Sequence, residues 1–303
     1  MSSPRQTVGA LVHAAAERLR TSGSETPRLD AEVLLAHVLR MDRASLLAHA
    51  ESPVGPAQAA ELEAALERRA KGEPVAYIRG VKEFYGIVFA VDPRVLIPRP
   101  ETEALVEIGL ARIVGALTAG PRPAGTPPLA VADVGTGSGA IAISLAFECR
   151  RRGYSPEVRI LASDASSEAL ALARENAVGH GVADVVSLAQ ADLLDELPAG
   201  MFDLVLANLP YVPSAAVAQL AVAASFEPRI ALDGGPDGLD VIRRLLDQLP
   251  RRLADGGTGL LEIGADQVDA IRQEVAERLA GWSVAVHADL GGQPRVAELR
   301  RGP

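Results

Sequence analysis

Residues 129–146 read LAVADVGTGSGAIAISLA. The first six residues form a short apolar run that predicts a buried β-strand, and the apolar pattern after Gly139 predicts a helix. Between them, three alternating glycines let the backbone turn sharply and approach a ligand that side chains would exclude. The start of the helix also presents free N–H groups. This stretch therefore predicts a strand, a ligand-binding glycine loop and a helix.

The sequence after this stretch alternates short apolar runs with longer helical patterns. Further strands are expected at 158–163, 185–190, 202–207, 257–263, 282–288 and 295–299. Such alternation predicts an α/β fold with a mainly parallel, doubly wound, seven-stranded sheet. No helical pattern separates the last two runs, so we expect an antiparallel hairpin through Leu290, Gly291 and Gly292.

The sequence before this stretch begins with a predicted helical domain, residues 1–75. Apolar residues recur at helical spacing, and the third helix is expected from Ala57 to Arg69. A connecting β-hairpin segment is expected at 76–100, with strands at 77–81 and 84–91. The rest of the chain is assigned to a third segment.

That third segment, 101–303, is expected to be the catalytic domain. Pro100 is predicted to begin a helix that runs to about Leu117. The stretch 118–129, TAGPRPAGTPPL, is rich in proline and glycine and is typical of a linker.

The composition excludes several classes of protein. The 303 residues include 30 Lys and Arg against 39 Asp and Glu, a formal net charge of −9. This acidic excess argues against a protein whose main task is to grip nucleic-acid phosphates. The single Cys149 cannot form an internal disulfide, and no apolar run approaches the roughly 18–20 residues of a membrane helix. We therefore expect a soluble, cytoplasmic protein.

Acidic residues end the first two strands of the predicted sheet. An anion at Asp133 would repel a pyrophosphate and attract a ligand that carries an ammonium group. Asp164 is placed to accept hydrogen bonds from both hydroxyls of a ribose, as in sites for NAD and for S-adenosylmethionine. After the third strand, Asp192 and Leu193 are placed to read the amine and the flat face of an adenine. An ordinary helix cap or turn at Asp192 remains an alternative.

The fourth strand is followed by Asn208-Leu209-Pro210-Tyr211. The Asn208 side-chain carbonyl and the backbone carbonyl before Pro210 can both accept from one planar N–H₂ group, while Tyr211 stacks on its face. Since the lone pair of a planar nitrogen is conjugated, this nitrogen needs positioning against a methyl donor more than it needs a base. The tetrapeptide therefore favours methyl transfer to nitrogen.

Taken together, these residues resemble the class I S-adenosylmethionine-dependent methyltransferases that act on nitrogen. Further segments are similar to consecutive landmarks of the HemK/PrmC family: GEPVAYIRG (72–80), FYGIVFAVDPRVLIPRPETEALVE (84–107), DVGTGSGAIAISLA (133–146), FEPRIALDGGPDGLD (226–240), LLEIGADQ (260–267) and DLGGQPRV (289–296). Members of that family are protein-(glutamine-N5) methyltransferases that modify the GGQ glutamine of peptide-chain release factors. The resemblance implies a Rossmann-like methyltransferase sheet and S-adenosylmethionine as the cofactor.

The resemblance also implies roles for individual residues. The cofactor contacts fall on Gly135, Thr136, Gly137, Ser138, Gly139, Asp164, Asp192, Leu193 and Asn208. Asn208, Pro210 and Tyr211 are the implied catalytic residues, and together with Leu209 they form the implied substrate site. The segment IPRPETE is expected to close over the cofactor and to help form the glutamine pocket. No metal is implied.

Leu209 departs from the family, which usually has a proline there. It frees one φ angle and restores an N–H, so we expect a somewhat looser loop. Asn-Leu-Pro-Tyr is also familiar from ribosomal-RNA adenine N6-dimethyltransferases, so an adenine N6-methyltransferase acting on RNA or DNA remains an alternative. Those enzymes have their helical domain after the core, the reverse of the order here, and the acidic charge also favours a protein substrate.

The expected partner is a peptide-chain release factor, bound by a monomer without direct contact to nucleic acid or membrane. Two other interpretations stay open. A non-catalytic module that keeps the cofactor fold would account for Leu209. A nicotinamide-dependent oxidoreductase fits the glycine loop, but it leaves the Asn208 tetrapeptide unexplained.

Overall fold

The computed structural model describes residues 6–120, 123, 125–198 and 200–302. The chain divides into two compact units. The helical unit comprises Met1–Val81 and Leu220–Phe226, and the sheet unit comprises Lys82–Gln219 and Glu227–Pro303.

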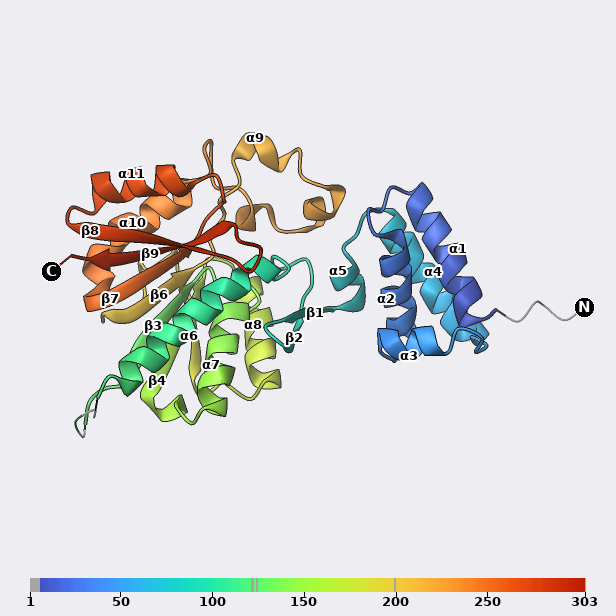
Figure 1. The fold of residues 1–303 in the computed structure, drawn as a ribbon, viewed down its shortest axis with the longest axis horizontal. Helices are drawn as coiled ribbons and strands as arrows, with labels where there is room; N and C mark the ends of the chain where they lie inside the picture. Colours follow the sequence, from blue (N-terminus) through green and yellow to red (C-terminus); the bar gives the residue numbers. More distant parts are fainter. Residues whose placement is uncertain (1–5, 121–122, 124, 199, 303) are drawn as a thin grey trace, which may run out of the picture. The chain divides into compact units, whose positions relative to one another are not determined.

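The helical unit is a bundle whose elements are α1 (Val8–Thr21), α2 (Pro27–Leu39), α3 (Arg43–Ala48), α4 (Pro56–Ala70), α5 (Val75–Arg79) and the 3₁₀ helix η3 (Val222–Phe226). Figure 1 shows α1 to α4 in blue. Their apolar stripes meet in a core in which Leu19, Leu34 and Leu35 are fully buried. The short helix α3 was not expected. It begins where the Asp42 side chain accepts a hydrogen bond from the Ser45 backbone N–H at 2.7 Å.

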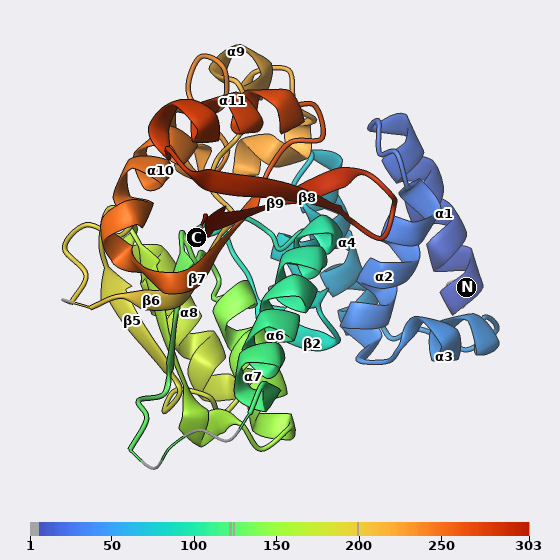
Figure 2. The ribbon, with the colours of Figure 1, turned by 60° about the vertical axis from the view of Figure 1, so that its left-hand side comes forward.

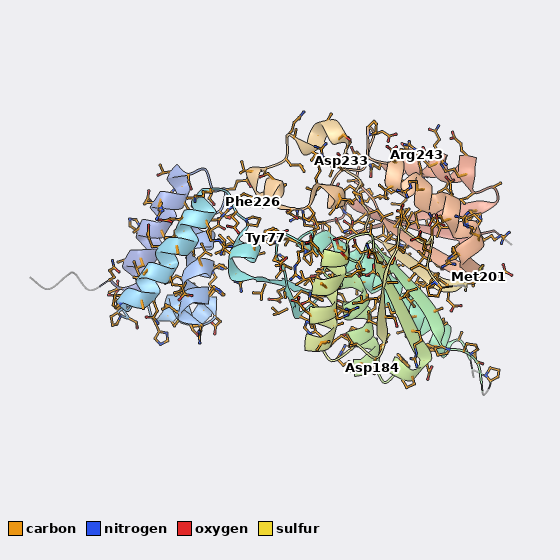
Figure 3. The ribbon with its side chains drawn as sticks, turned by 180° about the vertical axis from the view of Figure 1, so that it is seen from behind. Tyr77, Asp184, Met201, Phe226, Asp233 and Arg243 are labelled. Carbon is orange, nitrogen blue, oxygen red and sulfur yellow. The ribbon has the colours of Figure 1, made fainter. Side chains whose placement is uncertain are left out.

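The strand expected at 77–81 is wrong, because most of this stretch is helix α5. Pro74 precedes the helix, Gly80 ends it with a φ of 72°, and Tyr77 is buried in it (Figure 3). The expected hairpin is present, but its strands are β1 (Val81–Phe84) and β2 (Ile87–Ala90), so the strand expected at 84–91 is confirmed only over β2. Tyr85 and Gly86 both have positive φ, at 50° and 73°, and make its two-residue turn.

The sheet unit contains the predicted seven-stranded, doubly wound sheet. Its strands are β3 (Leu129–Val134), β4 (Val158–Asp164), β5 (Val186–Gln190), β6 (Phe202–Ala207), β7 (Leu253–Glu262), β8 (Trp282–Ala288) and β9 (Pro294–Arg301). They lie in the order β5-β4-β3-β6-β7-β9-β8. β9 runs antiparallel to both of its neighbours, whereas the pairs among β3 to β7 are parallel. The antiparallel hairpin expected at the end of the chain is therefore confirmed.

Helices cover both faces of this sheet. The described helices of the sheet unit are η1 (Pro100–Thr102), α6 (Glu103–Thr118), α7 (Ala140–Arg151), η2 (Ser155–Glu157), α8 (Ser167–Gly179), α9 (Ser214–Val217), η4 (Arg229–Ala231), α10 (Asp240–Arg252) and α11 (Val268–Arg278). α6, α7 and α8 pack on one face, and α10 and α11 pack on the other (Figures 1 and 2). Among the described residues, no helix has both the length and the apolar character that crossing a membrane requires.

In the described part of the chain, the connection before β3 and the connection between β5 and β6 are loops. The expected linker at 118–129 leads directly into β3, although its residues 121, 122 and 124 lie outside the described residues. Between β5 and β6, the described residues form turns and no helix. An alternation of strand and helix therefore describes most of the sheet unit, but not this connection.

The strand order reverses between β3 and β6, which is where open α/β sheets bind ligands. Val134, the last residue of β3, lies opposite Ser163 of β4 and Ala207 of β6. The next residues of all three strands therefore emerge at the same edge. The sheet brings together Gly135, Asp164 and Asn208, although they are far apart in the sequence.

Candidate active site

A cavity of about 360 Å³ opens at this carboxyl edge of the sheet, within the sheet unit. Its volume falls in the range of about 300–1,000 Å³ that is usual for small-molecule sites. Most residues singled out from the sequence line it: Gly135, Thr136, Gly137, Ser138, Asp164, Asp192, Leu193, Asn208, Leu209 and Pro210. Gly139 and Tyr211 do not belong to the lining.

The glycine loop presents its backbone to the cavity. Gly135, Gly137 and Gly139 have φ values of 73°, 53° and 83°, a conformation that L-residues with side chains rarely adopt. The N–H groups of Gly135 and Thr136 both donate to the Ser163 carbonyl at 2.9 Å. Gly139 precedes helix α7, and its N–H donates to the Thr136 carbonyl. The loop is thus fixed by main-chain hydrogen bonds and left-handed glycines.

Asp164 joins the end of β4 to this loop. Its Oδ2 accepts from the Gly137 N–H and its Oδ1 accepts from the Ser166 N–H, each at 2.9 Å. The pKa of its carboxyl is raised above the usual value, because the effect of burial exceeds the opposite effect of the backbone hydrogen bonds. Because Asp164 also lines the cavity, it combines support of the loop with acceptor capacity toward a ligand.

Asp133 lies beneath the loop rather than on the cavity wall. The residue is fully buried, and its Oδ2 accepts from the Thr136 hydroxyl at 2.6 Å and from the Ala142 N–H at 3.1 Å. Burial raises the pKa of its carboxyl to about 6. Asp133 therefore supports the glycine loop against helix α7 through Oδ2, while its Oδ1 has no hydrogen-bond partner among the described residues. The attraction of an ammonium group to Asp133 stays a prediction.

The segment after β5 forms another part of the wall. Asp192 forms an ion pair with Arg244 of α10. No helix begins there, so the helix-cap alternative is wrong, but Asp192 does begin a turn, in which its carbonyl accepts from the Asp195 N–H at 3.3 Å. Leu193 is 7% exposed and has a φ of 59°, which is uncommon for a residue with a side chain. The Ser163 hydroxyl donates to its carbonyl at 3.3 Å. Tertiary contacts thus hold Leu193 at the wall in an unusual conformation.

Beside the glycine loop, the Asn208 side chain is tied to the IPRPETE segment. Its Nδ2 donates to Thr102 Oγ1 at 3.0 Å, and both residues line the cavity. The Leu209 side chain is only 4% exposed, and its Cδ2 lies 3.1 Å from the position that a Cβ on Gly135 would occupy. Apolar packing therefore constrains Leu209 where the family usually has a proline.

Tyr211 extends away from the cavity wall. Its hydroxyl donates to Glu262 Oε1 at 3.2 Å, and burial raises the pKa of the phenol above its usual value. Its backbone carbonyl accepts from Gln267 Nε2 at 3.1 Å. The stacking role that the resemblance implies for Tyr211 therefore stays a prediction, while its anchoring is a property of the structure.

The segment 232–240 packs tightly behind the same tetrapeptide. A Cβ on Gly234 would lie 2.6 Å from the Pro210 carbonyl oxygen, and one on Gly238 would lie 2.3 Å from the Tyr211 carbonyl oxygen. Only residues without a Cβ allow this approach. Asp233, labelled in Figure 3, accepts from Ser214 Oγ at 2.5 Å within the same region.

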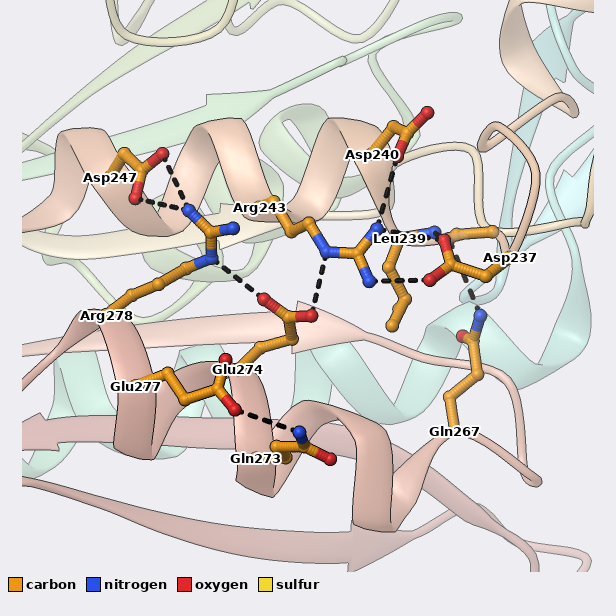
Figure 4. Close-up of polar contacts among 11 residues, drawn as sticks. Asp237, Leu239, Asp240, Arg243, Asp247, Gln267, Gln273, Glu274, Glu277 and Arg278 are labelled. Atoms are coloured by element: carbon orange, nitrogen blue, oxygen red, sulfur yellow. Dashed lines mark hydrogen bonds and ion pairs between the residues drawn. The ribbon is translucent and has the colours of Figure 1, made fainter.

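Helices α10 and α11 fix that segment through arginine ion pairs (Figure 4). Arg243 Nε donates to Glu274 at 2.8 Å, and Arg243 Nη2 donates to Asp237 at 2.5 Å. Arg278 contacts the other oxygen of Glu274 at 2.8 Å. Through Asp237, these contacts tie the segment 232–240 to helices α10 and α11.

The cavity also has a cationic side that sequence reasoning missed. Arg99 lines the cavity, and its Nη2 donates to Glu227 Oε1 at 2.6 Å. The other oxygen of the buried Glu227 accepts from the Ile97 N–H at 3.1 Å. Thr102, Glu262 and Gln267 were missed as well. All of them lie inside the quoted motifs, but nothing in the sequence shows which contacts they make.

Comparison with known proteins defines the class. Residues 10–80 match the family described as PrmC N-terminal domain, and residues 125–228 match the methyltransferase small domain. The hMettl16 catalytic domain, solved in complex with MAT2A 3′UTR hairpin 1, has a TM-score of 0.54 at 14% identity over 84% of each chain, a similarity of fold alone. The sheet, its glycine loop and these matches define an S-adenosylmethionine-dependent methyltransferase with a Rossmann-like fold.

Relatives then define the family. The release factor glutamine methyltransferase of Moorella thermoacetica is 44% identical over 291 residues, 96% of each chain. That of Rhodopirellula baltica is 37% identical over 298 residues, 97% of this chain and 96% of its own. The chain therefore belongs to the release factor glutamine methyltransferase family, in agreement with the motifs by which it resembles HemK/PrmC proteins. Its methyl donor is S-adenosylmethionine.

Proposed function

We propose that this enzyme methylates the side-chain amide nitrogen, N5, of the GGQ glutamine in a peptide-chain release factor. The observation that carries the proposal is the anchored Asn208 side chain on the cavity wall, beside the glycine loop. In the reaction, a bond forms between N5 and the methyl carbon while the bond from that carbon to sulfur breaks. One amide proton leaves to solvent, and the products are N5-methylglutamine and S-adenosylhomocysteine.

The cavity fits S-adenosylmethionine on chemical grounds. When bound, this cofactor supplies an electrophilic methyl group. The left-handed glycine backbone allows close approach of a ligand, and Asp164 supplies acceptors suited to ribose hydroxyls. The proposed cofactor residues are Gly135, Thr136, Gly137, Ser138, Gly139, Asp164, Asp192, Leu193 and Asn208. Of these, Gly139 acts by ending the loop at α7, since it does not line the cavity.

The substrate glutamine is proposed to lie at the Asn208 wall. Asn208 Oδ1 and the backbone carbonyl before Pro210 accept from its N–H₂ group, which fixes the nitrogen in line with the methyl carbon. Leu209 keeps this wall against the glycine loop through its buried side chain. Tyr211 is proposed to stack on the glutamine amide, which requires its ring, not its anchored hydroxyl, to face the substrate.

We assign recognition of the release factor to residues 1–75, with 76–100 as the connection and 101–303 as the methyltransferase domain. The match of residues 10–80 to the PrmC N-terminal domain supports the first assignment. A monomer in the cytoplasm that makes no direct contact with nucleic acid is proposed as the working form. The buried thiol of Cys149, whose pKa burial raises to about 11, is in keeping with a reducing compartment.

The proposal is tested by incubating the purified enzyme with a release factor and S-adenosylmethionine labelled in its methyl group, then mapping the modified residue by mass spectrometry. We expect one labelled methyl group on the GGQ glutamine. Label in added RNA or DNA instead would support the adenine alternative. Cofactor binding without any transfer would support a non-catalytic module.

A further inference from the structure

Asn176 of helix α8 carries a buried amide that joins two distant segments of main chain. The residue is 5% exposed. Its Oδ1 accepts from the Ala90 N–H at 2.8 Å, while its Nδ2 donates to the Ala90 carbonyl at 3.1 Å and to the Ser138 carbonyl at 2.9 Å. A backbone N–H only donates and a carbonyl only accepts, so these three bonds permit one orientation of the amide.

The first of these segments leads into the cavity wall. We call residues 91–99, which follow Ala90 at the end of β2, the strap. The strap contains turns but neither helix nor strand, and the part of it that lines the cavity is Pro93, Arg94, Val95, Leu96, Pro98 and Arg99. Because no helix or strand fixes it, its position depends on contacts with other elements. Asn176 holds its beginning at Ala90, and Glu227 holds its end at Arg99.

The second segment is the glycine loop. The Ser138 carbonyl accepts from Asn176, and on the other side of the same peptide unit the Gly139 N–H donates to the Thr136 carbonyl at 2.9 Å. Gly137 and Gly139, both with positive φ, flank this position, and glycine backbone is permissive enough to let such a peptide unit rotate. Asn176 therefore opposes rotation of the peptide unit that precedes α7.

We propose that Asn176 is a positioning residue for the cofactor, which fixes the glycine loop and the strap relative to each other so that the cavity they line fits S-adenosylmethionine. Asn176 does not belong to the cavity lining, so it acts through Ser138 and through the strap. All three parts lie in the sheet unit. This inference rests on the proposed function for its cofactor residues, but not for the glutamine substrate.

The first experiment uses the wild-type protein. The chain has two asparagines, Asn176 and Asn208, so ¹⁵N labelling of asparagine side chains gives two N–H₂ groups for NMR, and Asn208→Ala assigns them. Two carbonyls accept from Asn176 Nδ2, so its protons should exchange with water at least about tenfold more slowly than those of Asn208. If these bonds favour cofactor binding, the cofactor must stabilise them in return. Adding S-adenosylmethionine should therefore slow the exchange at Asn176 by about fivefold or more.

The second experiment is the substitution Asn176→Asp. Aspartate has nearly the same shape and keeps an acceptor for the Ala90 N–H, but an ionised carboxylate offers no hydrogen to the two carbonyls. The Kd for S-adenosylmethionine, measured by calorimetry, should rise by about tenfold or more. Because Asn176 makes no hydrogen bond to the Asn208 wall, kcat at saturating cofactor should stay within about threefold of the wild type.

The matched control is His180→Ala, because His180 also fastens β2 to α8. Its Nε2 donates to the Val88 carbonyl at 2.9 Å, and its ring lies 5.3 Å from that of Phe89. Neither contact involves the glycine loop. The Kd for S-adenosylmethionine should therefore stay within about twofold of the wild-type value in this variant.

An unchanged Kd in Asn176→Asp, or a rise no larger than that in His180→Ala, would show that Asn176 only docks β2 and would overturn the inference. Exchange at Asn176 that stays the same when the cofactor is added would overturn it as well. That measurement decides the matter even if Asn176→Asp does not fold. Failure of the wild type to methylate any glutamine overturns the proposed function instead, because neither the Kd nor the exchange rate depends on methyl transfer.

Discussion

Two walls of the cavity are built in different ways: the glycine wall, formed by the loop after β3, and the Asn208 wall, formed by Asn208, Leu209 and Pro210 after β6. On the glycine wall, the Gly139 N–H bonds a carbonyl three residues away, and the Gly137 N–H reaches Asp164 only 27 residues on. On the Asn208 wall, Asn208 and Thr102 are 106 residues apart, and Tyr211 and Glu262 are 51 apart. The first wall is shaped by local backbone conformation. The second exists only once distant strands and helices have packed together.

The strongest test of this difference is Asn208→Ala. If the Asn208 wall mainly positions the substrate while the glycine wall supplies most of the cofactor contacts, kcat should fall by about 10²- to 10³-fold while binding of S-adenosylmethionine weakens far less and stays measurable. Steady-state kinetics and calorimetry measure the two quantities separately. Unchanged turnover would contradict the assignment, and a large loss of cofactor affinity would show that the walls do not act separately.

A second test asks whether the glycine wall depends on a buried charge as well as on its backbone. The pKa of Asp133 is raised from its usual 3.8 to about 6, so the folded protein holds this proton more tightly than the unfolded chain. The contribution of Asp133 to the free energy of unfolding should therefore fall as the pH rises from about 4 to 7. At about 1.4 kcal/mol for each pH unit between these two pKa values, that fall amounts to about 3 kcal/mol.

Asp133→Asn should reduce this pH dependence, because an amide does not titrate while its oxygen can still accept from Thr136 and Ala142. Urea unfolding of the wild type and the variant at pH 4.5 and pH 7 gives the difference. Identical pH dependence in both proteins would show that Asp133 does not carry the effect.

A smaller effect is expected from Asp164→Asn. Both carboxylate oxygens accept backbone N–H groups, from Gly137 and Ser166, whereas an asparagine offers one acceptor and a competing donor. One buried N–H group then loses its partner, so the affinity for S-adenosylmethionine should fall about tenfold. Asp195→Asn, an acidic residue outside the cavity lining, is the matched control for the loss of charge. Equal affinities of the two variants would contradict a role for Asp164 in the glycine wall.

The smallest effect is expected from Arg244→Ala. Arg244 and Asp192 line the cavity as an ion pair, but their side chains are 52% and 59% exposed. Exposed pairs of this kind contribute about 0–1 kcal/mol, so the free energy of unfolding should change by less than about 1 kcal/mol. A larger change, measured by urea unfolding, would show that this pair fastens the two elements.

The sequence predicted much of the site because the signals are local. The glycines at 135, 137 and 139 require left-handed backbone, and the acidic and amide residues follow predicted strands, whose carboxyl ends share one edge. The same kind of reasoning failed at 77–81. There, the apolar residues suited a strand, but Pro74 and Gly80 delimit a helical turn.

Contacts could not be predicted from these patterns. Nothing in the tetrapeptide showed that the Tyr211 hydroxyl would bond Glu262, or that Asp133 would lie beneath the loop instead of on the wall. Leu209 looked like the loss of a rigid proline, whereas the structure shows a buried side chain beside Gly135. Each outcome depends on which element packs behind the residue.

The sequence by itself determined the doubly wound sheet, the glycine loop and the family, because apolar periodicity and residues of special backbone conformation act over a few positions. The tertiary structure decided how Asn208 is oriented and what supports it. A side-chain amide takes its direction from its partners, and Thr102 becomes a partner of Asn208 only when η1 packs beside the segment that follows β6.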